Sequence, residues 1–171
     1  KTERKPSSLT EAIGLSSFLR SERTDFLFGM IIVLFAIVTF IAMFSYLNTG
    51  AADQSLLESL RPGEWLNTDK EFCNYCGSFG AIISYLFITE NFGFSAFLIP
   101  AFLILVGVKM MQIFTVNLWK WFFGMAVSMI WLSLFLSKVL SPFMTEWVFN
   151  PGGNHGAIGV EYIENVIGPP G

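Results

Sequence analysis

Two cysteines separated by two residues stand in the stretch CNYCGSFGA, which covers residues 73–81. Cys73 and Cys76 together can act as a thiol–disulfide redox centre, or they can supply half of a zinc site. The glycines that follow, Gly77 and Gly80, favour a third interpretation, in which the chain bends into a helix at a membrane surface. The three interpretations predict an enzyme, a metalloprotein and a membrane anchor, respectively.

The rest of the sequence completes neither a redox relay nor a metal site. Membrane thiol oxidoreductases pass electrons from one cysteine pair to a second pair, and this chain contains no other cysteine. A zinc site needs about four ligands, whereas the two cysteines and the single histidine, His155, give at most three. We therefore expect Cys73 and Cys76 to form a local disulfide or to remain free thiols, and His155 to be a solvated turn residue. No other residues have the types and spacing of a catalytic, cofactor-binding or metal site.

The composition is that of a membrane protein. Of the 171 residues, 53% are hydrophobic and only 13% are charged, whereas charged residues make up about a quarter of soluble domains. The formal net charge of −3 provides no basic surface for nucleic acid. No charged residue lies near the middle of an apolar segment, which argues against an ion or proton path and therefore against a transporter.

Three long apolar segments predict membrane-spanning helices within a membrane domain of residues 26–171. The first contains 22 residues without a charge, and at about 1.5 Å per residue it can cross a hydrocarbon core of about 30 Å. The second contains Pro100, and the third ends near Lys138, whose side chain can reach the membrane surface. The predicted spans cover about residues 26–47, 94–109 and 119–140.

The segments outside the spans are of three kinds. Two apolar segments too short to cross a membrane predict helices on the outer surface, at about residues 78–90 and 156–167. Residues 49–77 predict a polar loop with one short helix at residues 55–60. Residues 1–25 are polar and basic and predict an amphipathic segment on the cytoplasmic membrane surface.

The distribution of basic residues orients the chain. Residues 1–25 contain five Lys or Arg and the turn at residues 109–120 contains two, whereas the other three lie on the opposite side of the predicted spans. Basic residues accumulate on the cytoplasmic side, so we expect the N-terminus in the cytoplasm and the loop 49–77 in the periplasm. Trp65 in this loop is a candidate partner contact, although a Trp at this place is also expected as an anchor in the membrane interface.

An internal repeat relates the two predicted surface helices. Residues 77–93 and 153–168 both begin with Gly-x-x-Gly-Ala-Ile, and both end with Glu-Asn shortly before a glycine. The glycines allow the backbone to turn into each helix and to pack closely on a neighbour. The sequence therefore predicts an all-α polytopic membrane protein of two repeated helical hairpins, each with a short outer surface helix. By the repeat, a fourth span is expected after Gly171.

The order and spacing of these motifs resemble the N-terminal membrane domain of the FtsK/SpoIIIE DNA translocases, in the form seen in Bacteroidetes-like bacteria. The resemblance covers about residues 20–168 and includes the stretches FSYLNTGAADQS, NYCGSFGAIIS, NFGFSAFLIP and PGGNHGAIG. The residues that carry the family's motifs are Asn74, Gly77, Gly80, Ala81, Phe92, Gly93 and Pro100, with Gly153 and Gly156 in the second copy. The pattern requires neither of the two cysteines.

This resemblance implies a function. In the family, four membrane helices precede a linker and a RecA-like motor, which forms a hexamer on double-stranded DNA and uses ATP and Mg²⁺. The chain would then be the membrane anchor and oligomerisation domain of a translocase that acts in cell division and chromosome segregation at the bacterial inner membrane. The expected partners are the lipid bilayer, other copies of the chain and other division or envelope proteins, with DNA bound only through the motor.

No residue of this segment is assigned to ATP or DNA, because the sequence contains no Walker lysine motif. Two other functions compete with that of a translocase anchor. A membrane thiol–disulfide oxidoreductase would use Cys73 and Cys76 and would lose its activity in a Cys73→Ser variant. A membrane scaffold subunit without a motor would have the same spans and no catalytic residue.

Overall fold

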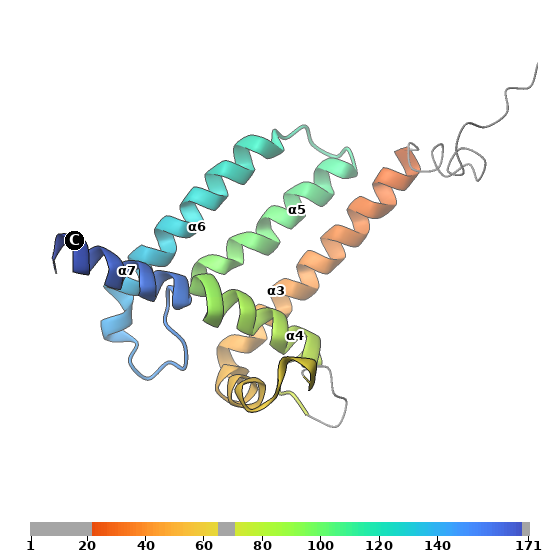
Figure 1. Cartoon of the computed structure of the whole chain (residues 1–171). Helices are drawn as coiled ribbons and strands as arrows, with labels where there is room; N and C mark the ends of the chain where they lie inside the picture. Colours follow the sequence, from red (N-terminus) through yellow and green to blue (C-terminus); the bar gives the residue numbers. More distant parts are fainter. Residues whose placement is uncertain (1–21, 65–70, 169–171) are drawn as a thin grey trace, which may run out of the picture.

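The computed structural model describes residues 22–64 and 71–168, and these contain helices and connections but no strand. Three helices lie side by side, and two others lie across one end of them (Figure 1). The side-by-side helices are α3 (Glu22–Ser59), α5 (Leu98–Met110) and α6 (Leu118–Leu140), and the crossing helices are α4 (Gly77–Ser84) and α7 (Gly153–Ile167). The connections contain the π-helix η2 (Tyr85–Phe92) and the 3-10 helices η1 (Pro62–Glu64), η3 (Gly93–Phe97) and η4 (Ser141–Phe143). The predicted all-α fold class is confirmed.

Three segments of the described residues are long and apolar enough to cross a membrane, namely Glu22–Ser59, Gly77–Met110 and Leu118–Phe143. The second segment is not one straight helix, because the backbone turns at Gly93 (φ 59°, ψ −137°), and α4 and α5 point in different directions (Figure 1). Together, η3 and α5 rise by about 30 Å, which matches the hydrocarbon core. This geometry fits a surface helix followed by a span, and the membrane boundaries themselves stay predictions.

The loop predicted at residues 49–77 is wrong for residues 49–54, because α3 continues to Ser59, and the helix predicted at residues 55–60 is the end of α3. Side chains four residues apart hold these polar turns together: Thr49 Oγ1 donates to Asp53 Oδ2 (2.7 Å), and Gln54 Nε2 donates to Glu58 Oε1 (2.9 Å). A polar helix of this kind lacks the apolar periodicity that identifies helices in a sequence. Trp65 lies outside the described residues.

The buried core lies at the end of the molecule where α4 and α7 cross α3, α5 and α6. Its largest members include Met43, Tyr46 and Leu57 from α3 and Ile88 from η2, each at most 1% exposed. Phe149, which precedes α7, joins this core and lies with its ring 6.2 Å from that of Tyr46 and 5.7 Å from that of Phe94. The second hairpin (α6 to α7) thus completes the core of the first (α3 to α5).

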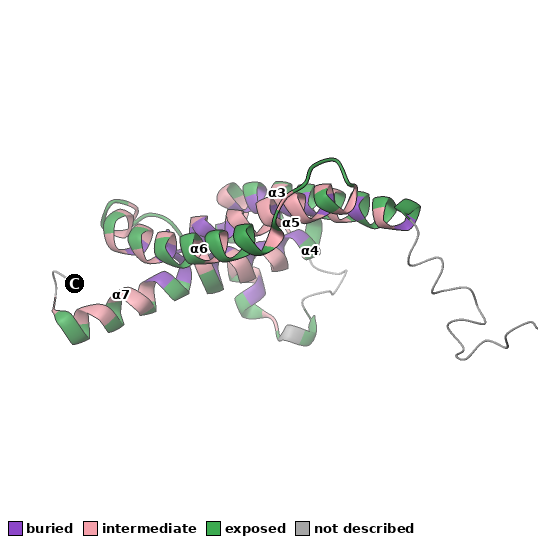
Figure 2. Ribbon diagram, turned by 90° about the horizontal axis from the view of Figure 1, so that it is seen from above, coloured by how far each residue is buried: buried purple, intermediate pink, exposed green. Residues whose placement is uncertain are grey.

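The membrane-spanning faces are much less covered than this core. In the apolar window of α3, 28% of the residues are buried, against 11% in that of α6. Exposed residues run along α6 (Figure 2). The best-packed contact between spans joins α3 to α5 at two glycines: a Cβ atom on Gly29 would lie 2.6 Å from the Gly107 carbonyl oxygen, and one on Gly107 would lie 2.6 Å from that of Gly29. Small residues of this kind let membrane helices approach closely.

Candidate functional site

The start of α4 is attached to α3 by the buried side chain of Asn74 and by Ser45 and Asp53 of α3, which accept from the Tyr75 and Cys73 N–H groups. Asn74 Nδ2 donates to the Ala42 carbonyl oxygen (2.9 Å), and Asn74 Oδ1 accepts from the Cys76 backbone N–H (3.0 Å). The Asn74 carbonyl oxygen accepts from the Gly77 N–H (2.8 Å). Gly77 has φ 62°, which favours glycine, and Gly80 faces α3 so closely that a Cβ there would lie 3.1 Å from Cβ of Ala42. We call Asn74–Ala81 the first helix-start motif.

The start of α7 repeats the backbone turn of this motif beside α6, although Asn150 Nδ2 donates to Ser141 Oγ of η4 (3.3 Å) where Asn74 donates to α3. Asn150 Oδ1 accepts from the Gly152 N–H (2.9 Å), and the Asn150 carbonyl oxygen accepts from the Gly153 N–H (2.7 Å). Gly153 has φ 68°. Gly156 packs against α6, where an added Cβ would lie 2.9 Å from Ser133 Oγ. We call Asn150–Ala157 the second helix-start motif, since its backbone follows the first one residue by residue.

The two hairpins are locked together where the end of η2 meets the second helix-start motif. The Phe94 N–H donates to the Pro151 carbonyl oxygen (2.9 Å). A Cβ on Gly153 would overlap the Asn91 carbonyl oxygen and lie 2.5 Å from the Gly93 nitrogen, and one on Gly93 would overlap the Pro151 oxygen. Both glycines have positive φ. Neither position therefore accepts a side chain, and we call this contact the inter-hairpin joint.

Side chains extend the joint on both sides. The ring of His155 lies 5.0 Å from that of Phe92, and His155 Nδ1 lies 3.4 Å from Ser133 Oγ. Asn154 Nδ2 donates to Glu90 Oε2 (3.4 Å). His155 is exposed, as expected, but it lies in the first turn of α7 and not in a loop, with its ring against the first hairpin. The sequence did not reveal this contact because its partner is distant along the chain.

The remaining motif residues are structural. Ala81 is fully buried in the core, and Phe92 packs against this core. Pro100 is buried in the first turn of α5, where the missing N–H of a proline has no helical acceptor to lose. Among the motif residues, the structure therefore brings the bend at Gly93 and the start of α7 together, whereas Pro100 and Ala81 support the fold around them.

The two cysteines are unpaired in the structure. The Cys73 N–H donates to Oδ1 of the buried Asp53 (2.7 Å), and Cys76 Sγ approaches the Val38 carbonyl oxygen at 3.6 Å. Cys76 occupies the place that Gly152 has in the second motif, so this backbone geometry does not need sulfur. In the described part of the chain, no three His, Cys, Asp or Glu residues are grouped as metal ligands. The redox state of the pair stays a prediction.

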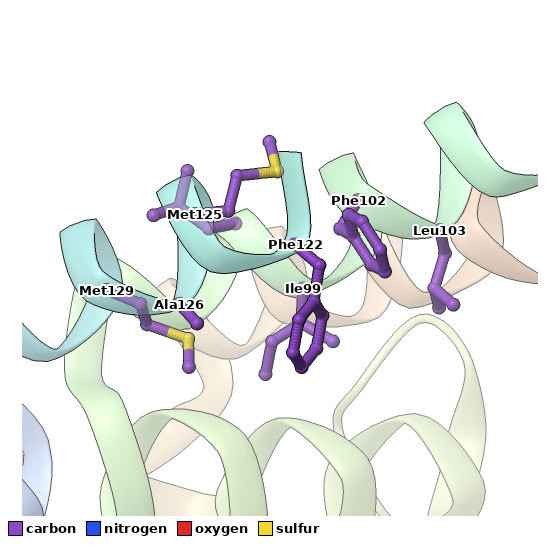
Figure 3. Close-up of a pocket in the computed structure, with 8 residues that line it drawn as sticks. Ile99, Phe102, Leu103, Phe122, Met125, Ala126 and Met129 are labelled. Carbon is purple, nitrogen blue, oxygen red and sulfur yellow. The ribbon is translucent and has the colours of Figure 1, made fainter. Parts of the chain in front are cut away.

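An apolar hollow on the surface lies between α5 and α6 (Figure 3). Its wall is apolar, with the rings of Phe102 and Phe122 5.7 Å apart. The lining residues are Leu98, Ile99, Phe102, Leu103, Phe122, Met125, Ala126 and Met129. A groove of this kind suits hydrocarbon and contains no side chain for chemistry.

Sequence reasoning missed two polar residues that shape the site. Asn150 would have been found by extending the repeat three residues towards the N-terminus, since Asn-x-x-Gly occurs in both copies. Ser133 gave no such signal, because the corresponding residue of α3 is the apolar Val38. The Ser133 hydroxyl donates to the Gly152 carbonyl oxygen (2.6 Å).

A family model described as the 4TM region of the DNA translocase FtsK/SpoIIIE matches residues 21–171. The chain belongs to this family. The predicted resemblance is therefore confirmed, and the match covers both helix-start motifs of the 4TM region and the joint between them. Comparison with curated proteins and with solved structures gives no match. The fourth span of the 4TM region stays a prediction.

Replacing Asn74 by alanine is expected to lower the free energy of unfolding by about 1–3 kcal/mol, because the part-buried Cys76 N–H loses its acceptor and the buried bond from Asn74 to α3 is lost. The measurement is unfolding by sodium dodecyl sulfate in mixed micelles. Asn154→Ala is the matched control, since Asn154 is exposed and its side-chain contact is long. Equal stabilities of the two variants would contradict the role given to Asn74.

Proposed function

We propose that this 4TM region anchors and assembles an ATP-driven DNA translocase in the bacterial inner membrane, for cell division and chromosome segregation. The observation that carries the proposal is the inter-hairpin joint. Two hairpins that share one backbone plan are fixed to each other at Gly93 and Gly153, and Phe149 of the second hairpin enters the core of the first. Such a region is a rigid platform and not merely a set of separate membrane tethers.

The proposed mechanism is positional. Holding several motors in one membrane plane raises their effective concentration and favours their assembly, as a hexamer by analogy with the family. The start of α3 and the connection between α5 and α6 lie at the end opposite α4 and α7 (Figure 1), and the positive-inside rule assigns this end to the cytoplasm. ATP, Mg²⁺ and double-stranded DNA are expected to bind the motor and not this region. Other division or envelope proteins are proposed to bind the opposite, periplasmic end, and Trp65, which lies outside the described residues, is a candidate contact.

The test replaces residues 22–168 in the full-length protein by an unrelated membrane anchor of the same orientation. We expect the protein to stay in the membrane but to lose its position at the division septum and its role in chromosome segregation. Normal localisation and segregation with the foreign anchor would reduce this region to a tether. Intact mass and peptide mapping of the natural protein separate the translocase from a scaffold without a motor, since only the former contains a Gly-x-x-x-x-Gly-Lys-Ser/Thr peptide.

Removing both thiols is expected to leave the function intact, because the second helix-start motif forms the same geometry with Gly152 in place of Cys76. The double variant Cys73→Ser, Cys76→Ser should change the free energy of unfolding by no more than about 1 kcal/mol and should leave septal localisation unchanged. Loss of function without loss of stability would instead favour a thiol–disulfide oxidoreductase.

A further inference from the structure

The repeat creates two surface-helix starts and two surface-helix ends, and the inter-hairpin joint uses one of each. It pairs the end of the first surface helix, at Gly93, with the start of the second, at Gly153. Of the described residues, none makes such a contact with the start of the first helix or with the end of the second. Gly77 has φ 62°, as Gly153 has φ 68°, yet no described atom lies within 4 Å of a Cβ placed on it. Gly168, with φ 97°, ends α7 as Gly93 ends η2.

Apolar side chains are exposed at both of these ends. Tyr75 is 82% exposed and Phe79 is 49% exposed at the start of α4, and Ile167 is 72% exposed at the end of α7. Counted from the motif glycines, Tyr75 corresponds to Pro151, which is fully buried in the joint. Counted from Gly77 and Gly153, Phe79 corresponds to His155, and counted back from Gly93 and Gly168, Ile167 corresponds to Phe92; the rings of His155 and Phe92 meet across the joint.

We infer that a second copy of this chain docks head to tail, with the end of α7 on the start of the neighbour's α4, and that this contact repeats the inter-hairpin joint. Ile167 then lies against the partner's Phe79, and Gly168 faces the partner's Gly77. The inference rests on the proposed oligomerisation and names the surface that produces it. A contact between two different surfaces generates a ring when the rotation closes.

The intermolecular joint differs from the internal one in one respect. Pro169 follows Gly168 in the sequence, where Phe94 follows Gly93. A proline has no N–H, so the hydrogen bond from Phe94 to Pro151 has no counterpart between subunits. The contact between copies therefore depends on the burial of large side chains that are exposed in a single copy, namely Tyr75, Phe79 and Ile167.

Disulfide cross-linking in the natural membrane tests this contact. In the full-length protein with Cys73→Ser and Cys76→Ser, the added pair Tyr75→Cys and Ile167→Cys should give a ladder of multimers after oxidation, which is lost on reduction. Each single variant should give no product alone, whereas two differently tagged single variants expressed together should give only mixed dimers. Tyr75→Cys with Phe143→Cys, which is 83% exposed on η4, is the control pair and should not cross-link.

A charge swap provides a second test that does not need added cysteines. Tyr75→Arg alone and Ile167→Asp alone should each lower the oligomer mass, and the combination should restore it. Homodimers from Tyr75→Cys alone would overturn the head-to-tail contact in favour of a symmetric one. If the oligomers stay intact but show neither the cross-link nor the rescue, the head-to-tail contact is overturned, whereas the proposed oligomerisation is not. A monomeric protein, with these side chains covered by lipid, would overturn both.

Discussion

Replacing Gly153 by alanine is expected to lower the free energy of unfolding by about 2–5 kcal/mol and to separate the two hairpins. Positive φ costs a residue with a Cβ about 1–2 kcal/mol, and overpacking costs about 1–3 kcal/mol more. The added Cβ would meet backbone atoms of Asn91 and Gly93, which cannot move aside like the end of a side chain. The measurement is unfolding in mixed micelles, together with a spin-label distance between α5 and α6.

Gly77→Ala is the matched control for this prediction. Gly77 has the same sign of φ and the same place in its motif, but a Cβ there meets open space. In the monomeric chain, only the conformational cost of about 1–2 kcal/mol is then expected, with no change in the distance between α5 and α6. If the two variants lost equal stability, the close approach at Gly153 would contribute nothing, and the inter-hairpin joint would not hold the platform together.

The second large effect is expected where α3 crosses α5. Gly29→Ala should lower the free energy of unfolding by about 1–3 kcal/mol, because the new Cβ would lie 2.6 Å from the Gly107 carbonyl oxygen and the two helices would have to move apart. Unfolding in mixed micelles measures the loss. A cross-link between cysteines on α3 and α5, placed on exposed positions near the crossing, reports the separation directly.

Gly124→Ala is the control, because Gly124 precedes Ser133 on α6 by nine residues, as Gly29 precedes Val38 on α3. No atom lies within 4 Å of a Cβ on Gly124. In the 171-residue chain, the substitution should be neutral or stabilise the helix by up to about 1 kcal/mol. In a longer form that includes the predicted fourth span, it should cost as much as Gly29→Ala. A neutral result in both forms would show that no span packs on α6 as α5 packs on α3.

The parts of the fold that the sequence predicted are those encoded by local backbone requirements. Gly77 and Gly153 need a positive φ, and Gly80 and Gly156 need room on one face of a helix. Both requirements restrict the residue type at a fixed spacing, so the repeat was visible as Gly-x-x-Gly-Ala and predicted two hairpins with surface helices. The apolar segments predicted helices of membrane length for the same reason, since length and polarity are local properties.

The parts that sequence reasoning missed depend on distant contacts or on polar helical turns. The partner of Gly93 is Gly153, and no local pattern pairs two glycines so far apart in the chain. The last turns of α3 are polar and are supported by side-chain hydrogen bonds, so they were interpreted as a loop. The π-helix η2 was also missed: α4 and η2 contain 8 residues each, whereas α7 contains 15, and a wider turn accommodates the extra residue.

The most direct test of the proposed anchoring and assembly is the native mass of the full-length protein in lipid nanodiscs, compared with a form that ends after the fourth span and lacks the motor. We predict that both forms contain the same number of copies, because the membrane region itself carries the assembly contact. A monomeric membrane region beside an oligomeric full-length protein would contradict this, since the motor alone would then drive assembly.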